Sequence, residues 1–396
     1  MKRLLLICGA AALLCACQPK GFVLDGSIDN AEGAKVSLID ASTQQEVNNA
    51  RIENGKFRME GSVDAPGRYI LQIDTNDPDT PSDKADAQKI FATDFYLENS
   101  KIAISADTRT LPTIYWQEGR VTEPALVTGS RQEELRRALD ERRKEVNARL
   151  NGLYKRMSEE YYIPLEEGRA EEARKAGVEI VRAEQQAQDE RTQIMIEFAR
   201  EHPEAAVSFD EISYLMGGLT SLTAAEVDEY LAILAPAWEG TPQFEQLKGL
   251  AGMTKRLAVG EPYIDCEFYN LDGEKVKLST VIPQGRYVML EFWASWCGPC
   301  RGEIPHLKHI REVYPDFDIV SVSVDDKDAD WKRALKEEKM DWVQLRDEGF
   351  TAGKAFSEYQ VMGIPCCLVL DPQGRFYKVN MRGAYLDAFL QELYGR

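Results

Sequence analysis

The strongest constraint on the fold is the sequence Trp-Cys-Gly-Pro-Cys at 296–300, which directly follows a nearly continuous apolar run at 287–293. An apolar run of this length is typical of a strand buried at the centre of a sheet. Two cysteines separated by two residues at the start of a helix lie on one turn, close enough to form a disulfide. The sequence therefore predicts a buried strand, a cysteine pair and a helix in immediate succession.

The position of each cysteine indicates its chemistry. Cys297 precedes the expected helix, where unpaired amide hydrogens and the helix dipole stabilise a thiolate. A thiolate is the attacking species in disulfide exchange, and Cys300, one turn later, is placed to resolve the mixed disulfide. Pro299 is tolerated in the first turn, where an amide hydrogen would lack a partner. A zinc site is the alternative, but the adjacent Cys366 and Cys367 would point to opposite faces of a strand.

Strands and helices alternate along residues 257–396, which predicts an α/β fold with a short sheet. The predicted strands are 287–293, 317–324, 366–370 and 376–380, and the predicted helices are 299–314, 328–339 and 385–393.

The segment 292–300 resembles the active site of thioredoxins. Its continuation at 301–305, the Gly-Ile-Pro at 363–365 and the turn at 371–375 resemble the TlpA/ResA-like family of bacterial envelope thioredoxins. The resemblance covers residues 257–396 and implies a C-terminal thioredoxin fold with thiol–disulfide oxidoreductase activity. This chemistry needs no organic cofactor and no metal.

The resemblance also implies a substrate site around the dithiol. Pro365 is expected in a cis peptide bond that faces Cys297 and Cys300 and helps to dock the substrate, although cis is a minority outcome for any one proline. The residues implied in docking are Trp296, Gly298, Pro299, Ile364 and Pro365.

Two carboxylates are candidates for proton transfer. Glu291 lies inside the apolar strand, where desolvation raises a carboxyl pKa toward the range that suits a dithiol. The alternative is an edge residue whose head reaches water. Glu303 lies one turn after Cys300 on the same helix face. The resemblance implies an acid here that tunes the cysteine pKa and the substrate groove, and the alternative is a solvent-facing charge.

The other cysteines and histidines of this region have less specific interpretations. Cys366 stands where the family usually has Thr, and we expect a small strand residue in preference to a third redox thiol. Cys367 is expected in the core, and Cys266 lies on an early strand with no evident partner. His306 and His309 are both expected on the helix surface.

The N-terminus has the pattern of an export signal. A positive start at 1–3 precedes an apolar run at 4–14, which is shorter than the roughly 20 residues of a membrane span. The exit resembles a bacterial lipobox with Cys17 as the lipidated residue, and ordinary signal cleavage is the alternative. By the rule that Asp after the lipid cysteine retains a lipoprotein at the inner membrane, Gln18 favours the outer membrane.

Short apolar or alternating runs separated by turn residues fill residues 22–115, which predicts an antiparallel β-sandwich or barrel. The clearest strands are 22–24, 35–39, 56–59 and 68–73. The pattern resembles the β-rich domain of unknown function that precedes thioredoxin domains in envelope lipoproteins.

Apolar residues at helical spacing predict one long helix at 135–161 and a second, charged helix at 168–200, with the break at Pro164. We expect a helical spacer with solvated faces, and the alternative is a partner-binding or dimerisation face. The chain is thus predicted to contain a lipoprotein signal peptide at 1–16, a β-rich domain at 17–125, a helical spacer or hairpin at 126–256 and a thioredoxin-like domain at 257–396.

Composition excludes several classes of protein. The formal charge of −18 gives no electrostatic reason to bind nucleic acid. Eight cysteines in 396 residues are too sparse for a disulfide scaffold.

We therefore expect a lipid-anchored thiol–disulfide oxidoreductase in the envelope of a Gram-negative bacterium, facing the periplasm. The Gly-Pro dipeptide between the cysteines resembles that of reducing thioredoxins. It favours a reductase that acts on envelope proteins and receives electrons from a membrane thiol donor. One alternative is a thiol-dependent peroxidase, although residues 288–300 lack the peroxiredoxin pattern. The other is a binding or scaffold lipoprotein whose functional module is 22–255.

Overall fold

A computed structural model describes residues 20–77, 79–81, 84–115, 120–350 and 352–395. The expected signal peptide at 1–16 and the expected lipid site at Cys17 lie outside these residues. The chain divides into two compact units, residues 1–138 and 139–396. Within the described residues, no helix combines the length and the apolar character that a membrane crossing requires.

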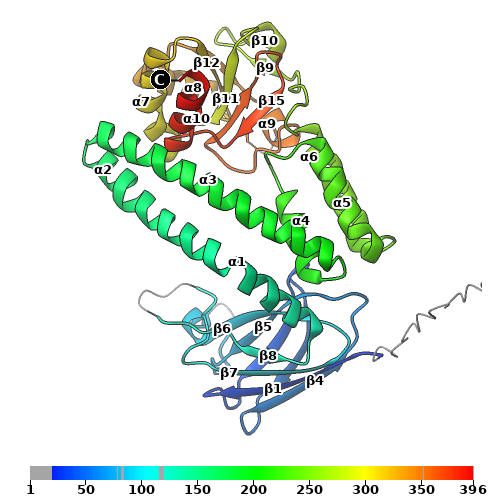
Figure 1. Cartoon of the computed structure of the whole chain (residues 1–396). Helices are drawn as coiled ribbons and strands as arrows, with labels where there is room; N and C mark the ends of the chain where they lie inside the picture. Colours follow the sequence, from blue (N-terminus) through cyan, green and yellow to red (C-terminus); the bar gives the residue numbers. More distant parts are fainter. Residues whose placement is uncertain (1–19, 78, 82–83, 116–119, 351, 396) are drawn as a thin grey trace, which may run out of the picture. The chain divides into compact units, whose positions relative to one another are not determined.

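The N-terminal unit contains two four-stranded sheets with one shared core (Figure 1). The first sheet has the order β4 (Lys56–Gly61), β1 (Phe22–Asp29), β7 (Lys101–Asp107) and β8 (Leu126–Thr128). The second has the order β3 (Glu46–Arg51), β2 (Lys35–Asp40), β5 (Gly67–Asp74) and β6 (Ile90–Leu97). Apolar residues alternate toward the core along β1 and β5, which confirms the predicted β-rich fold.

The sheets differ from the sequence-based prediction in their pairing and in the strands that it did not name, which are β3, β6, β7 and β8. β1 pairs with β7 in parallel, so the unit is not purely antiparallel. β3 was not predicted, because it is an edge strand of mostly polar, exposed residues that shows no apolar alternation.

A set of helices follows. They are α1 (Arg131–Arg156), the π-helical turn η3 (Met157–Tyr162), α2 (Ile163–Glu166), α3 (Ala170–Glu201), α4 (Ala206–Leu215), α5 (Ala224–Trp238) and α6 (Pro242–Arg256). The predicted apolar stripe of the first long helix is buried, as Leu139, Val146 and Leu150 show. We use the name helical hairpin for the part of α1 after residue 138 together with η3, α2 and α3.

The chain does not break at Pro164. Pro164 lies in the first turn of α2, where a missing amide hydrogen costs no helical hydrogen bond. The reversal comes a few residues later, at 167–169, where Gly168 adopts a φ of 79°. Glycine accepts this left-handed conformation without steric cost.

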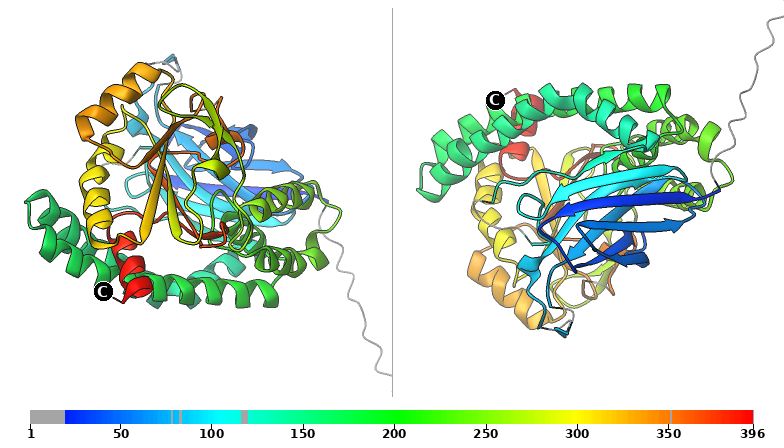
Figure 2. Two further views of the ribbon diagram at one scale, coloured as in Figure 1. Left: turned by 90° about the horizontal axis from the view of Figure 1, so that it is seen from above. Right: turned by 90° about the horizontal axis from the view of Figure 1, so that it is seen from below.

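The C-terminal sheet has seven strands (Figure 2). Their order is β10 (Lys275–Lys277), β9 (Glu267–Tyr269), β13 (Val343–Arg346), β12 (Phe317–Ser323), β11 (Tyr287–Trp293), β14 (Cys366–Leu370) and β15 (Phe376–Val379). The helices are α7 (Gly298–Val313), α8 (Asp328–Glu338), α9 (Lys354–Ser357) and α10 (Ala384–Tyr394). β11 runs parallel to β12 and antiparallel to β14. The predicted α/β fold, with its buried central strand, is confirmed.

The helical hairpin packs directly on this α/β domain. α3 lies against α10 in Figures 1 and 2, and Ala384 and Ala388 of α10 belong to the same buried apolar cluster as Val178 and Val181 of α3. The expectation of a spacer with solvated faces did not include this contact.

Candidate active site

The cysteine pair lies at the first turn of α7, as predicted. Cys297 is the N-cap residue, and a disulfide joins it to Cys300. The Cys300 amide donates a hydrogen bond of 3.2 Å to the Cys297 Sγ atom, and Pro299 occupies the first turn. When the disulfide is reduced, this amide and the helix dipole favour the thiolate of Cys297.

A buried aspartate anchors the loop that leads from β11 to the dithiol. Asp325 accepts hydrogen bonds from the Ser295 amide (2.9 Å), the Ser295 hydroxyl (2.6 Å) and the Ser323 hydroxyl (2.7 Å). Its side chain is buried, and it follows directly after the predicted strand at 317–324. Asp325 was not predicted, although its place at the carboxyl end of a buried strand is where the functional sites of α/β sheets lie.

The residues that the resemblance implies in docking lie in the dithiol segment itself and directly before β14. Strand β14 pairs with β11 so that Cys366 lies opposite Phe292, which brings Pro365 to the edge where the dithiol loop begins. The Ile364–Pro365 peptide bond is cis. Trp296 is 64% exposed, and Met362, which precedes the Gly-Ile-Pro segment and was not predicted, is 71% exposed. Gly298 and Pro299 are also exposed, and Ile364 and Pro365 are half-buried. Trp296 and Met362 thus present apolar side chains to solvent.

Glu291 is a buried carboxyl, not an edge residue. Its side chain is in the core, and Ser321 donates a hydrogen bond of 2.6 Å to Glu291 Oε2. The Trp342 indole donates a hydrogen bond of 2.8 Å to the same Ser321 oxygen. The Ser321 hydroxyl therefore accepts from Trp342 and donates to Glu291. Burial raises the pKa of Glu291 to about 7, the Ser321 hydrogen bond opposes this rise, and the negative charge of Glu303 adds to it. A carboxyl with this pKa exchanges protons near neutral pH.

Glu303 belongs to a second, partly buried cluster. His306 Nδ1 lies 2.7 Å from Glu303 Oε1, and His306 Nε2 lies 2.8 Å from Asp387 Oδ1 on α10. The Gly383 amide also donates to Glu303 Oε1, at 2.8 Å. Burial alone would raise the pKa of Glu303, but the hydrogen bond and charge of His306, the Gly383 amide and Arg382 outweigh it and lower that pKa.

His306 was predicted on the helix surface, and this prediction is wrong. Its side chain is only 13% exposed. Burial alone would lower the pKa of His306, but the hydrogen bonds and charges of Asp387 and Glu303 raise it to about 9. The Glu-x-x-His spacing on one helix face was visible in the sequence, but Asp387 lies some eighty residues away and gave no signal.

The three remaining described cysteines are all buried thiols. Burial raises the pKa of Cys266 to about 11 and that of Cys366 to about 12, and it also raises the pKa of Cys367. A thiol of this kind is rarely ionised and is a poor nucleophile. Burial thus supports the interpretation of Cys366 as a small strand residue. Among the described residues, no group of three or more His, Cys, Asp or Glu side chains is placed to hold a metal ion.

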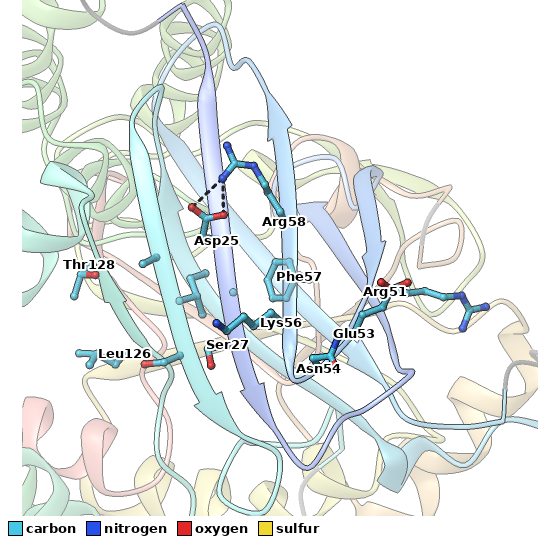
Figure 3. A pocket seen from close by; sticks show the side chains of 14 residues that line it. Asp25, Ser27, Arg51, Glu53, Asn54, Lys56, Phe57, Arg58, Leu126 and Thr128 are labelled. Atoms are coloured by element: carbon cyan, nitrogen blue, oxygen red, sulfur yellow. Dashed lines mark hydrogen bonds and ion pairs between the residues drawn. The ribbon is translucent and has the colours of Figure 1, made fainter.

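The N-terminal unit has a surface hollow of about 710 Å³ on its β4–β1–β7–β8 sheet (Figure 3). An ion pair between Asp25 and Arg58 (2.9 Å) lies at its rim, and Leu126 is 58% exposed beside it. The hollow carries polar and apolar side chains together, and the sequence analysis did not predict it.

A dithiol at the start of a helix on a thioredoxin-like sheet defines a thiol–disulfide oxidoreductase domain. Comparison with known proteins agrees. A family model described as thioredoxin-like matches residues 285–376, and the domain of unknown function DUF4369 matches residues 22–135. The thioredoxin-like protein YneN of Bacillus subtilis is 30% identical over 133 residues, which are 31% of this chain and 71% of that protein. The chain belongs to the thioredoxin-like family.

Other similarities concern the same domain. The thiol-disulfide oxidoreductase ResA of Bacillus cereus is 25% identical over 158 residues, which are 39% of this chain and 86% of that protein. Among solved structures, the thioredoxin domain of a thiol-disulfide oxidoreductase from Bacteroides vulgatus is 29% identical, with a TM-score of 0.32, and the match covers 35% of this chain and 98% of that one. The family model and the similarity to ResA show that the C-terminal domain is homologous to thiol–disulfide oxidoreductases.

Proposed function

We propose that this protein is a lipid-anchored disulfide reductase of the bacterial cell envelope that acts on exported proteins. The observation that carries the proposal is the Cys297–Cys300 pair at the N-terminus of α7, with the buried carboxyl of Glu291 in the strand that leads to it. The exposed apolar side chains of Trp296 and Met362 support a polypeptide substrate.

The reaction follows from the position of each sulfur. The Cys297 thiolate attacks a substrate disulfide, so a bond forms between Cys297 and one substrate sulfur while the other sulfur leaves as a thiolate. Glu291, in its ionised form, accepts the proton of Cys300. The Cys300 thiolate then attacks the Cys297 sulfur, the second substrate sulfur leaves, and the protein holds the disulfide. A membrane thiol donor then reduces this disulfide and is itself oxidised to a disulfide, while Glu291 returns the proton to Cys300, which completes the cycle.

Reduction of insulin disulfides by the full chain tests this proposal. Wild type is expected to be active, and Cys297→Ser and Cys300→Ser are expected to be inactive. A reduction potential near that of thioredoxin, about −270 mV, supports a reductase, whereas a value near about −120 mV indicates an oxidant. Rapid consumption of hydrogen peroxide without insulin reduction would instead support the peroxidase alternative.

The proposed anchor rests on the N-terminal sequence alone, with Cys17 after a short apolar run. Metabolic labelling with a radioactive fatty acid tests it. Label is expected in wild type and in Cys15→Ser and is expected to be lost in Cys17→Ser. Equal labelling of both variants, or none in wild type, contradicts lipid attachment at Cys17. Fractionation of the labelled protein then tests our preference for the outer membrane.

The surface hollow of the N-terminal unit favours partner binding as a second candidate function. The test uses the full chain with both active-site cysteines replaced by serine, so that covalent capture is absent. A partner retained by this protein and lost on Leu126→Asp supports binding at the hollow. Val47→Asp is the matched control, because Val47 is similarly exposed (52%) on the other sheet. A partner that both variants retain contradicts this role.

A further inference from the structure

We propose that the helical hairpin is a positioning element of the redox centre, in which Tyr161 of η3 fixes the 382–384 segment that holds the Glu303 carboxylate near Glu291. This inference rests on the proposed function. It gives the helical region a role in the chemistry, where the sequence indicated a spacer.

The contact begins with a π-helical turn. η3 interrupts the regular α-helix from Met157 to Tyr162, and the Tyr161 side chain is buried there. Such π segments are rare and often lie at functional sites. The Ala384 amide at the start of α10 lies close enough to the Tyr161 hydroxyl to oppose the rise that burial causes in the Tyr161 pKa. It also lies so close to Gly383 that a Cβ atom there would be 2.8 Å from it.

The same segment holds the Glu303 cluster on its other side. The Gly383 amide donates to Glu303, and four residues later Asp387 bonds His306, which in turn bonds Glu303. The segment therefore lies against Tyr161 of the hairpin and bonds the Glu303 carboxylate through the Gly383 amide. We expect a displacement of the hairpin to move this segment, because Tyr161 packs so closely on Gly383.

A glycine on α3 makes this close approach possible. A Cβ atom at Gly177 would lie 2.6 Å from Tyr161 Cδ2 and 2.8 Å from the Ala384 Cβ atom. Side chains do not tolerate such distances, so any larger residue must push Tyr161 or α10 away. Gly177 lies inside α3, where glycine destabilises a helix relative to alanine. The close packing, and not the helix backbone, therefore explains a glycine at this position.

Displacement of Glu303 changes the ionisation of the titratable groups around it. The titratable groups that interact with it or its partners come from β11, β14, α7, the loop before α10, α10 itself and η3, and they include Glu291, Cys367, His306, His309, Arg382, Asp387 and Tyr161. Glu291 is the one that the proposed mechanism uses. Because the Glu303 charge disfavours ionisation of Glu291, displacement of Glu303 makes Glu291 ionise at lower pH.

The sharpest test is a pair of identical substitutions. Gly177→Ala wedges the hairpin from α10, whereas Gly152→Ala on α1 places its Cβ atom where nothing lies within 4 Å. Both exchange a helical glycine for alanine, so both favour their helix equally. The measurement is the pH profile of insulin reduction by the full chain. We expect Gly177→Ala to move the profile to lower pH by about half a unit, which changes the rate about threefold on the limb where Glu291 titrates. Gly152→Ala is expected to match wild type.

A second pair keeps the inference testable should Gly177→Ala fail to fold. Tyr161→Phe removes the hydroxyl at Gly383 and Ala384 and keeps the ring. Tyr385→Phe is the control, because it also removes a tyrosine hydroxyl between the hairpin and α10, one that donates to Glu184 of α3 (2.7 Å) and not to the 382–384 segment. The first is expected to shift the profile in the same direction as Gly177→Ala, and the second is not.

The outcomes separate this inference from the proposed function. Wild type that reduces no insulin overturns the proposed function. Active wild type with unshifted profiles for Gly177→Ala and Tyr161→Phe overturns the positioning role, as do equal shifts for Tyr161→Phe and Tyr385→Phe. A lower melting temperature with an unchanged profile shows that the hairpin only stabilises the domain, and that also overturns the inference.

Discussion

At the scale of single residues, the two cysteines have different expected roles because they differ in accessibility. Cys297 is 5% exposed and Cys300 is fully buried, so a substrate disulfide reaches Cys297 first. We expect Cys300→Ser to accumulate a mixed disulfide with substrate, since the resolving thiol is absent, and Cys297→Ser to form none. Non-reducing gels of each full-length variant after exposure to oxidised insulin measure this. Adducts on Cys297→Ser alone would reverse the assignment.

Glu291 gives a prediction about stability and pH. Burial raises its pKa from 4.5 to about 7, so the folded protein holds this proton more tightly than the unfolded chain. Stability from this group is therefore lost as pH rises from about 4.5 to 7. Glu291→Gln is expected to increase the free energy of unfolding of the C-terminal unit by about 3 kcal/mol more at about pH 8 than at about pH 4.

Urea unfolding at both pH values measures this difference. Glu312→Gln, which changes an exposed glutamate on α7, is the control. The same increment at both pH values for Glu291→Gln would show that this carboxyl is not perturbed in the fold.

The sequence predicted the residues whose evidence is local. The Cys-x-x-Cys spacing and the carboxyl inside an apolar strand are visible within ten residues of chain, and the structure places both as expected. It did not predict the partners of His306, because that contact depends on how α7 and α10 meet. Helical spacing shows which residues share a face of a helix. Whether that face contacts solvent or another element depends on the tertiary structure.

At the scale of elements, the dithiol loop depends on one buried aspartate. Asp325 joins the end of β12 to the loop after β11 through the hydrogen bonds of Ser295 and Ser323. Asp325→Ala leaves these buried donors without partners, and we expect a loss of about 3 kcal/mol of stability together with slower insulin reduction. Asp326→Ala, at the exposed neighbouring position, is the control. Equal effects of the two variants would contradict the anchoring role.

Strands and helices were predictable where periodicity was strong and contiguous. The long helices and the four main strands of the C-terminal domain are examples. β13 was missed because it is four residues long, and β7 because its pairing with β1 joins segments about eighty residues apart. The π-helical turn η3 was also not predicted, because its sequence continues an ordinary helical pattern.

At the scale of the molecule, His306 links α7 to α10 by charge. Its pKa is raised from 6.5 to about 9, so its contribution to stability is complete below about pH 6.5 and is lost as pH rises through 9. We expect His306→Gln to lower the stability of the C-terminal unit by about 3 kcal/mol at about pH 6 and much less above about pH 9.

Thermal unfolding at a series of pH values measures this effect. His309→Gln is the matched control on the same helix, because the pKa of His309 is lowered by burial and nearby positive charge. A pH-independent loss for His306→Gln would indicate a packing role in place of an ionic one.

The packing of α3 against α10 has a consequence for the evolution of this protein. The final helix of the redox domain packs its small residues Ala384 and Ala388 on the hairpin, and Ala384 lies so close to Gly177 that a Cβ atom there would be 2.8 Å from it. A gene fragment that ends or begins near residue 257 would separate the helical hairpin from the α10 surface on which it packs. We therefore expect recombination that exchanges redox domains between related proteins to preserve the fold only when the hairpin is exchanged together with the domain. The two segments would then evolve as one module.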